Sequence, residues 1–492
     1  MADDNETEHQ GFFGLRLTDD NESWKEFTFG STLPEIIRWG INDKPAPAED
    51  KAEDGLSGIL PAEDERSREL IIMSELLARV LDAGLALSEL TLSSRAIRDV
   101  FSQIVSRVEV VEPIRNSCSI VYQQDNIVIY GISADRMTRV RDQHRRLVRM
   151  DRGFDLLPSA VLLTVVATFD SLTADVVRTM LSLKPDRFTV GDRTIPVAEI
   201  LAMGSFDELK SRLLDDEVYQ FSRGSHEEQV KSIEKWFHVK IADSWKRWPD
   251  FIEVFERRNL IAHGEKQFTA RYVAICKSHN HKGSENLLDT PIELTSSYIS
   301  QALDVLVEFS ILLVFSIWRK QLPAEENSAF NEVNDACYRM ITEARYRVPV
   351  RVLEYVLSLK NTKIAESTRL MLIVNLSSAH RHCKNKDSSD KVLNSVDWSA
   401  VSDNYQICVA SLRDDVPGVI SLMPSVVQAK KIRKEDFRTW PVFSFVRSNE
   451  QFETKFGELF GEALFDPQAE ATTIEPDHAP QLDTTNPDAT FH

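Results

Sequence analysis

Cysteine is scarce in this sequence, and its few copies form no paired motif. The chain has 492 residues, yet its five cysteines are scattered and no two of them form a C-x-x-C pair. Secreted domains that depend on disulfides carry paired cysteines at a much higher density. The scarcity argues against a disulfide framework and indicates reduced thiols in a cytosol. The five are Cys118, Cys276, Cys337, Cys383 and Cys408.

Long uncharged apolar runs are also missing. None reaches the roughly 18 residues that a membrane-spanning helix needs. The run 309–318 is shorter, and Glu308 and Arg319 flank it. The first ten residues, MADDNETEHQ, are acidic and polar, unlike a secretory signal peptide. These features predict a soluble, cytoplasmic protein without a membrane segment.

Basic residues are outnumbered, and glycine-rich phosphate loops are absent. Lysine and arginine total 58 against 77 aspartates and glutamates, which gives a formal net charge of −19. A general nucleic-acid coat protein would carry a basic face and a high pI. A nuclease with a locally basic site remains compatible with this balance. No segment matches G-x-x-x-x-G-K or G-x-G-x-x-G, so we expect no nucleotide-driven function and no cofactor.

Two short hairpins are expected in the N-terminal third. Apolar runs at 12–17 and 24–29 flank a turn-rich DDNES segment. A second pair of runs, at 118–122 and 127–130, flanks QQDN. The segment 42–67 is charged, contains prolines and lacks periodicity, which predicts a linker.

Helical spacing dominates the remainder, so the predicted fold class is mainly α. From Arg68 onward, with Ser67 as a plausible N-cap, apolar residues follow the three-four spacing of an amphipathic helix. Further helices are expected at 93–107, 157–183, 196–214, 226–244, 249–263 and 293–319, with a loop at 264–292. We divide the chain into 1–67 (hairpin and acidic linker), 68–150 (helical N-terminal region with an arginine-rich helix), 151–322 (helical domain), 323–465 (helical, repeat-like) and 466–492 (disordered acidic tail).

Arginines gather unusually between residues 136 and 152, where the sequence holds seven of them. Arginine matches phosphate oxygens geometrically, so Arg145, Arg146 and Arg149 are candidate substrate-binding residues for RNA. The alternative interpretation is a solvated helix face that pairs with the surplus acids of the chain.

The segment 248–264, WPDFIEVFERRNLIAHG, combines an apolar helix with polar residues at its end. Pro249 suits the first helical turn, and Gly264 suits the termination of the helix. Arg258, Asn259 and His263 are unusual in a helix that is otherwise apolar. Cations near a helix C-terminus interact favourably with its dipole, by about 0.3–1 kcal/mol, so these residues also have a purely structural interpretation.

The end of this segment, RNLIAHG, resembles the R-x(4–6)-H motif of the HEPN superfamily, including the polar residue after the arginine. This resemblance implies that residues 151–322 form an all-helical domain that dimerises and, as in many members, cuts RNA without metal. Proteins similar to this are often toxins or antiviral effectors that arrest growth. The helix 157–183 would be the first long helix of the domain, with a helix at 293–319 closing it.

Metal-free RNA cleavage needs a base for the 2′-hydroxyl, a cation for the phosphate and an acid for the departing 5′-oxygen. His263 suits the base or acid role, Arg258 suits the phosphate, and Asn259 suits orientation of substrate or of His263. Because one chain supplies one motif histidine, a two-fold homodimer would bring two together. Five residues along a helix turn the direction by about 140°, so Arg258 and His263 meet only if Arg258 reaches round or the helix loosens.

Two further features have a functional and a structural interpretation. Asp170 either neighbours Arg258 or is a simple surface carboxylate of its helix. Cys276, His279 and His281 have the residue types and spacing of zinc ligands, but no fourth ligand is evident, so a polar loop is favoured and no metal is expected.

The C-terminal region contains two helix-pair units centred on 372–376 and 407–410, close to the 34-residue period of tetratricopeptide-type repeats. The signature residues of these repeats are not evident, so this similarity is weak.

Three functions follow as hypotheses: a HEPN-type endoribonuclease, a non-catalytic dimeric scaffold that binds a protein partner through these repeats, and a nucleic-acid-binding regulator that uses the arginines of 136–152. The last predicts a steep salt dependence of binding.

Overall fold

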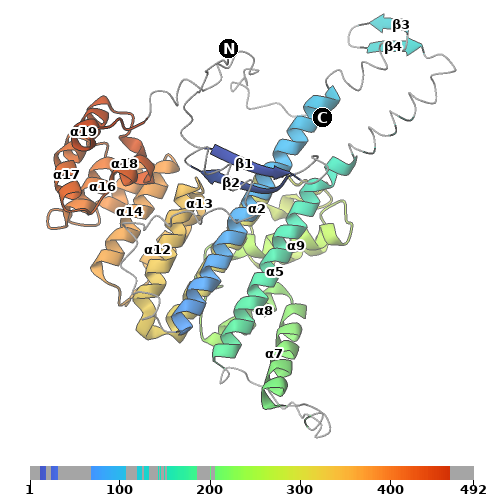
Figure 1. Cartoon of the computed structure of the whole chain (residues 1–492). Helices are drawn as coiled ribbons and strands as arrows, with labels where there is room; N and C mark the ends of the chain where they lie inside the picture. The colour runs from blue at the N-terminus through green and yellow to red at the C-terminus, as the bar shows by residue number, and fades with distance from the viewer. Residues whose placement is uncertain are drawn as a thin grey trace. The chain divides into compact units, whose positions relative to one another are not determined.

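The computed structural model describes residues 12–17, 24–30, 68–106, 119–124, 127–131, 142, 145, 149, 152–184, 200 and 205–465. This part of the chain is mainly helical, as predicted (Figure 1). By contacts the chain divides into two compact units, Gly58–Asp397 and a second unit of Met1–Ser57 with Trp398–His492. The predicted linker 42–67 with Ser67, and the predicted tail 466–492, lie outside the described residues.

Both predicted hairpins are confirmed. Strand β1 (Phe12–Leu17) pairs antiparallel with β2 (Trp24–Gly30). Strand β3 (Ser119–Gln124) pairs in the same way with β4 (Ile127–Gly131). Each hairpin is a separate two-stranded sheet.

Three long helices form the centre of the unit Gly58–Asp397. Helix α2 (Arg68–Ser106) packs on α5 (Leu157–Leu183), and both pack on α11 (Ser296–Gln321). Figure 1 shows α2 and α5 running side by side. A Cβ on Gly84 would lie 2.9 Å from Val307, so this glycine allows α2 to approach α11 closely.

The prediction of a separate helix at 93–107 is wrong, because α2 is one continuous helix. The polar stretch after Leu90 does not interrupt it. Thr91 donates its hydroxyl hydrogen bond to the carbonyl of Leu87 at 2.8 Å, and Ser94 donates to that of Thr91 at 2.9 Å. These hydroxyls are satisfied inside the helix, so they do not compete with its backbone.

Within the described ranges, two helices are long and apolar enough to cross a membrane, Arg152–Leu183 and Ser296–Gln321. The sequence argument missed them because it counted only uncharged runs. In this fold 78% of the apolar window of Ser296–Gln321 is buried inside the protein, against 44% for Arg152–Leu183. Burial of 78% is typical of a core helix. Phe309, Phe315 and Trp318 of α11 are among its fully buried side chains.

Four shorter helices follow α5 in the chain, and their bounds correct the predictions. Helix α7 (Phe206–Arg223) begins after the N-cap Ser205, and α8 (His226–Phe237) ends where His238 takes a left-handed conformation. Helix α9 (Trp248–Ala262) carries the motif. The expected loop 264–292 contains α10 (Ala270–Ser278) and the 3-10 turn η3 (Ser284–Asn286). Helix α10 forms because Thr269 caps it and because Tyr272 and Cys276, four residues apart, are both buried.

The same unit continues through four more helices and a 3-10 turn. They pack in sequence order, α12 against α13, α13 against α14 and α14 against α15. Their bounds are η4 (Pro323–Glu325), α12 (Glu326–Thr342), α13 (Arg347–Ser358), α14 (Glu366–His382) and α15 (Lys386–Leu393).

The second unit contains the remaining helices, and Phe437 is at the centre of an aromatic cluster in it. Its ring lies 4.9 Å from that of Phe443 and 6.1 Å from that of Phe452, centroid to centroid. Because the predicted helix pairs α14–α15 and α16–α17 belong to different units, the tetratricopeptide-like similarity stays a prediction. The elements are α16 (Asp403–Leu412), α17 (Val416–Gln428), α18 (Lys434–Thr439), η5 (Pro441–Phe445) and α19 (Glu450–Phe460).

Candidate functional site

Helix α9 is anchored by aromatic side chains on its buried face. Phe251 lies 4.4 Å from Phe309 of α11, and Phe255 lies 5.4 Å from Phe169 of α5, both measured between ring centroids. Such pairs contribute about 0.5–1.5 kcal/mol each beyond burial of their area. Pro249 stands in the first turn, as predicted. The aromatic contacts fix the direction of every other side chain on α9.

The C-terminus of α9 is a regular helix end. The N–H of His263 bonds to the carbonyl of Asn259 at 3.0 Å, so helical hydrogen bonding continues to His263. Gly264 adopts φ +75°, and the N–H of Glu265 bonds back to Leu260, which is a Schellman ending. The helix therefore does not loosen before Gly264. Arg258 and the exposed His263 point about 140° apart around the axis.

Arg257 belongs to a buried network that holds α9, α10 and α11 together. Its Nε lies 2.7 Å from Glu253 Oε1, and its guanidinium lies 3.8 Å from the ring centroid of Tyr298. Glu253 also accepts hydrogen bonds from the hydroxyls of Tyr272, at 2.6 Å, and Tyr298, at 2.9 Å. We call Glu253, Arg257, Tyr272 and Tyr298 the Glu253 network. Arg257 therefore has a structural role.

Arg258 points away from the Glu253 network, and its one ion pair is long. Its Nη2 lies 3.6 Å from Asp170 Oδ2 on α5, and its Nε is buried without a hydrogen-bond partner in the part of the chain that the structure describes. Of the two interpretations of Asp170, the neighbour of Arg258 is confirmed. The side chain is 23% exposed and makes one long ion pair, so its exposed part can bind an anionic ligand.

Asp170 has a second partner that the sequence analysis missed. His226 Nε2 lies 2.8 Å from Asp170 Oδ1, and the ring of His226 stacks on Phe255 with 3.5 Å between centroids and 12° between planes. His226 is the first residue of α8, which Ser225 caps together with Glu228. No motif signals this contact, because the two residues are 56 positions apart.

Glu256 is the second residue that sequence reasoning missed. It accepts a hydrogen bond from Asn259, and burial raises the pKa of its carboxyl. The charges of Arg271, His226 and His279 act in the opposite direction. Glu256, Asn259 and His263 are spaced i, i+3 and i+7, so they share one face of α9. That spacing is the signal that could have found Glu256. We call Asp170, His226, Glu256, Arg258, Asn259 and His263 the α9 cluster.

The candidate zinc ligands do not converge. Cys276 is fully buried, and burial raises the pKa of its thiol to about 12, whereas zinc binds the thiolate. His279 Nε2 lies 3.4 Å from Glu227 Oε2 instead. Among the described residues no group of three or more histidine, cysteine or acidic side chains could hold a metal ion.

The predicted substrate-binding arginines are described only in part. Arg145 and Arg149 are exposed, and Arg145 lies 3.6 Å from Asp142, three residues before it in sequence. Arg146 lies outside the described residues. Their role as RNA contacts stays a prediction.

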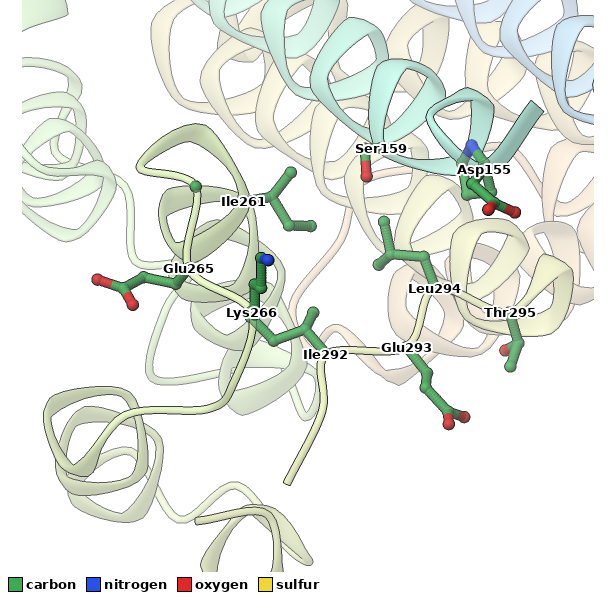
Figure 2. Close-up of a pocket in the computed structure, with 11 residues that line it drawn as sticks. Asp155, Ser159, Ile261, Glu265, Lys266, Ile292, Glu293, Leu294 and Thr295 are labelled. Atoms are coloured by element: carbon green, nitrogen blue, oxygen red, sulfur yellow. The ribbon is translucent and has the colours of Figure 1, made fainter. Parts of the chain in front are cut away.

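A pocket of about 670 Å³ lies beside the end of α9. Figure 2 shows Ile261 and Leu294 pointing into it, whereas Glu265 points away. Its lining includes three carboxylates but one lysine, which suits a phosphate backbone poorly. Neither Arg258 nor His263 lines it. The full lining is Asp155, Pro158, Ser159, Ile261, Gly264, Glu265, Lys266, Ile292, Glu293, Leu294 and Thr295.

Comparisons with protein-family models, with curated proteins and with solved structures found no match to this chain. The HEPN resemblance therefore stands on the motif and on its placement in a helical bundle.

Proposed function

We propose that this protein is a metal-independent endoribonuclease of the HEPN type, acting in the cytoplasm as a homodimer, with the α9 cluster as its site. The observation that supports this most is the state of Arg258. It is a partly buried arginine that keeps an unused donor, beside a second set of acid–base groups. Arg257, the preceding residue, is instead paired with Glu253 at 2.7 Å.

The reaction needs two proton transfers and one charge stabilisation. A base takes the proton of the ribose 2′-hydroxyl while its oxygen bonds to phosphorus and the bond from phosphorus to the 5′-oxygen breaks. An acid gives a proton to that 5′-oxygen, so the products are a 2′,3′-cyclic phosphate and a free 5′-hydroxyl. Arg258 holds the non-bridging phosphate oxygens, and His263 exchanges a proton with one of the reacting oxygens.

The homodimer supplies a second copy of His263 to the same cleft. An isologous contact places the same surface of each protomer against the other. His263 stands at the exposed end of α9, where a partner can reach it. The biological role that fits is a growth-arresting toxin or antiviral effector, with the C-terminal helices as the surface for a protein trigger.

The test is RNA cleavage by purified protein in excess chelator. Wild type is compared with Arg258→Ala and His263→Ala, while cell growth after induced expression is followed in parallel. Loss of one oxyanion-binding donor lowers rates by about 10²–10³, and loss of an acid–base group by about 10²–10⁴. We expect both variants to lose cleavage and growth arrest by these factors.

Arg79→Ala is the matched control, because Arg79 also pairs with an aspartate of α5, Asp175, at 3.4 Å. It is expected to cut RNA like wild type. If wild type, Arg258→Ala and His263→Ala behave alike in both assays, with or without activity, the ribonuclease proposal is wrong. The scaffold interpretation would then replace it.

A further inference from the structure

A second imidazole, that of His226, lies close to the motif arginine through Phe255 and Asp170. Phe255 precedes Arg258 by three residues and therefore points about 60° from it around α9, on the side of His263. The ring of His226 stacks on Phe255 at 3.5 Å. His226 therefore lies about one helical turn from Arg258, whereas His263 stands eight residues beyond Phe255, about 12 Å further along the axis.

The contacts of His226 fix its orientation. The Asp170 carboxylate binds Nε2 at 2.8 Å, so in the neutral ring Nε2 carries the proton and Nδ1 keeps its lone pair. Among the described residues no hydrogen bond to Nδ1 is formed. The side chain is 12% exposed, enough for one edge to meet solvent. A histidine oriented by a carboxylate in this way is the general arrangement of an activated base.

Asp170 couples this histidine to the phosphate-binding arginine. One of its oxygens bonds His226, while the other lies 3.6 Å from Arg258 Nη2. A phosphate bound at the solvent-exposed part of the Arg258 side chain would lie beside Asp170 and therefore near His226. Helix α8 holds its end of the site through the Ser225–Glu228 capping box.

We infer that His226, oriented by Asp170, is the general base of this site and acts within the same chain as Arg258. The inference rests on the proposed ribonuclease function and deepens it. His226 Nδ1 takes the proton of the 2′-hydroxyl as the new oxygen–phosphorus bond forms. Protonated His263 gives its proton to the 5′-oxygen as the old bond breaks, and exchange with water restores both rings.

With His226 as the general base, the homodimer no longer has to supply a second copy of His263. With His226 as base and His263 as acid, both proton transfers use different histidines of the sequence. Two copies of one histidine are then not required. The sequence motif alone could not provide this second group.

The test measures RNA cleavage in chelator by His226→Ala, with and without added imidazole. We expect a loss of about 10²–10⁴-fold, partly restored by imidazole, because the free base can enter the space that the side chain left. A structural role would not respond to imidazole at unchanged stability. The thermal unfolding midpoint of each variant is recorded alongside.

His279→Ala is the matched control. His279 also faces a carboxylate, Glu227 at 3.4 Å, and its side chain is 17% exposed, close to the value for His226. We expect it to cut RNA within about threefold of wild type, since it is outside the proposed proton path.

Asp170→Asn keeps the test valid if His226→Ala does not fold, because the ring and its stacking on Phe255 remain. Loss of cleavage in this variant at unchanged unfolding midpoint supports the inference. Wild-type rates in both His226→Ala and Asp170→Asn, together with loss in Arg258→Ala, would overturn the inference and leave the proposed function standing. Wild-type rates in Arg258→Ala would overturn the proposed function itself.

Discussion

The two sides of α9 use consecutive arginines in opposite ways. Arg257 enters the Glu253 network, where a carboxylate and two aromatic rings surround it. Arg258 enters the α9 cluster, where its nearest carboxylate is 3.6 Å away and 40% exposed. Successive residues of a helix point about 100° apart, so one step along the chain separates the two environments.

The difference between Arg257 and Arg258 shows how an arginine that stabilises the fold can be told from one that is free to bind a ligand. In the Glu253 network the carboxylate accepts from Arg257 and from two tyrosine hydroxyls. In the α9 cluster, Arg258 Nε is buried without a partner among the described residues. Close pairing commits Arg257 to the fold, whereas Arg258 is 23% exposed with one 3.6 Å ion pair and keeps the capacity to bind an anion.

Loss of charge at Glu253 is expected to have the largest effect on stability. Glu253→Gln leaves Arg257 as a buried charge without its counter-ion, which destabilises by about 3–5 kcal/mol. Urea unfolding of the full chain, followed by tryptophan fluorescence, measures this change. A loss below about 1 kcal/mol would show that the Glu253 network is not the structural side of α9.

Removal of one tyrosine hydroxyl should have an intermediate effect. Burial and the nearby Glu253 raise the pKa of Tyr298 well above its ordinary value, so its hydroxyl stays protonated and donates to the carboxylate. Tyr298→Phe removes a hydrogen bond to a charged group and should destabilise by about 1.5–3 kcal/mol in the same assay. Tyr219→Phe, at an exposed tyrosine of α7, is the control and should change little.

Glu256 should respond to pH in the direction opposite to a salt-bridged acid. Burial raises the pKa of its carboxyl, so the folded protein holds this proton more tightly than the unfolded chain. Stability is then lost as pH rises through the folded-state pKa. We expect Glu256→Gln to be more stable than wild type at pH 7–8, with a difference that shrinks toward acid pH. A difference that grows toward acid pH would contradict this cause.

Sequence patterns predicted many of the helices because residues within or next to each helix determine where it forms and ends. Helix α5 follows from apolar spacing and Pro158, and the end of α9 follows from Gly264, whose φ of +75° favours glycine. Helix α10 was missed because its stability comes from burial of Tyr272 and Cys276 against distant parts of the chain. Continuity of α2 was missed because Thr91 and Ser94 resemble a helix boundary in sequence.

Only those residues of the candidate site that lie on α9 could be predicted from the sequence. Arg258, Asn259 and His263 are recognisable as a motif. The separate roles of Arg257 and Arg258 depend on Tyr298 and Asp170, which lie on other helices. His226 is adjacent to Phe255 only in the folded chain. Sequence spacing within a helix cannot reveal contacts between helices.

The most direct test of this account measures stability and RNA cleavage together for Arg257→Ala and Arg258→Ala. Arg257→Ala should destabilise by about 3 kcal/mol or more, because it strands a buried carboxylate. Arg258→Ala should stay within about 1 kcal/mol of wild type, because its pairing is weak and partly exposed. It should nevertheless lose cleavage by about 10²-fold or more. If Arg258→Ala cuts RNA like wild type, or loses as much stability as Arg257→Ala, the division of α9 into a structural and a functional side is wrong.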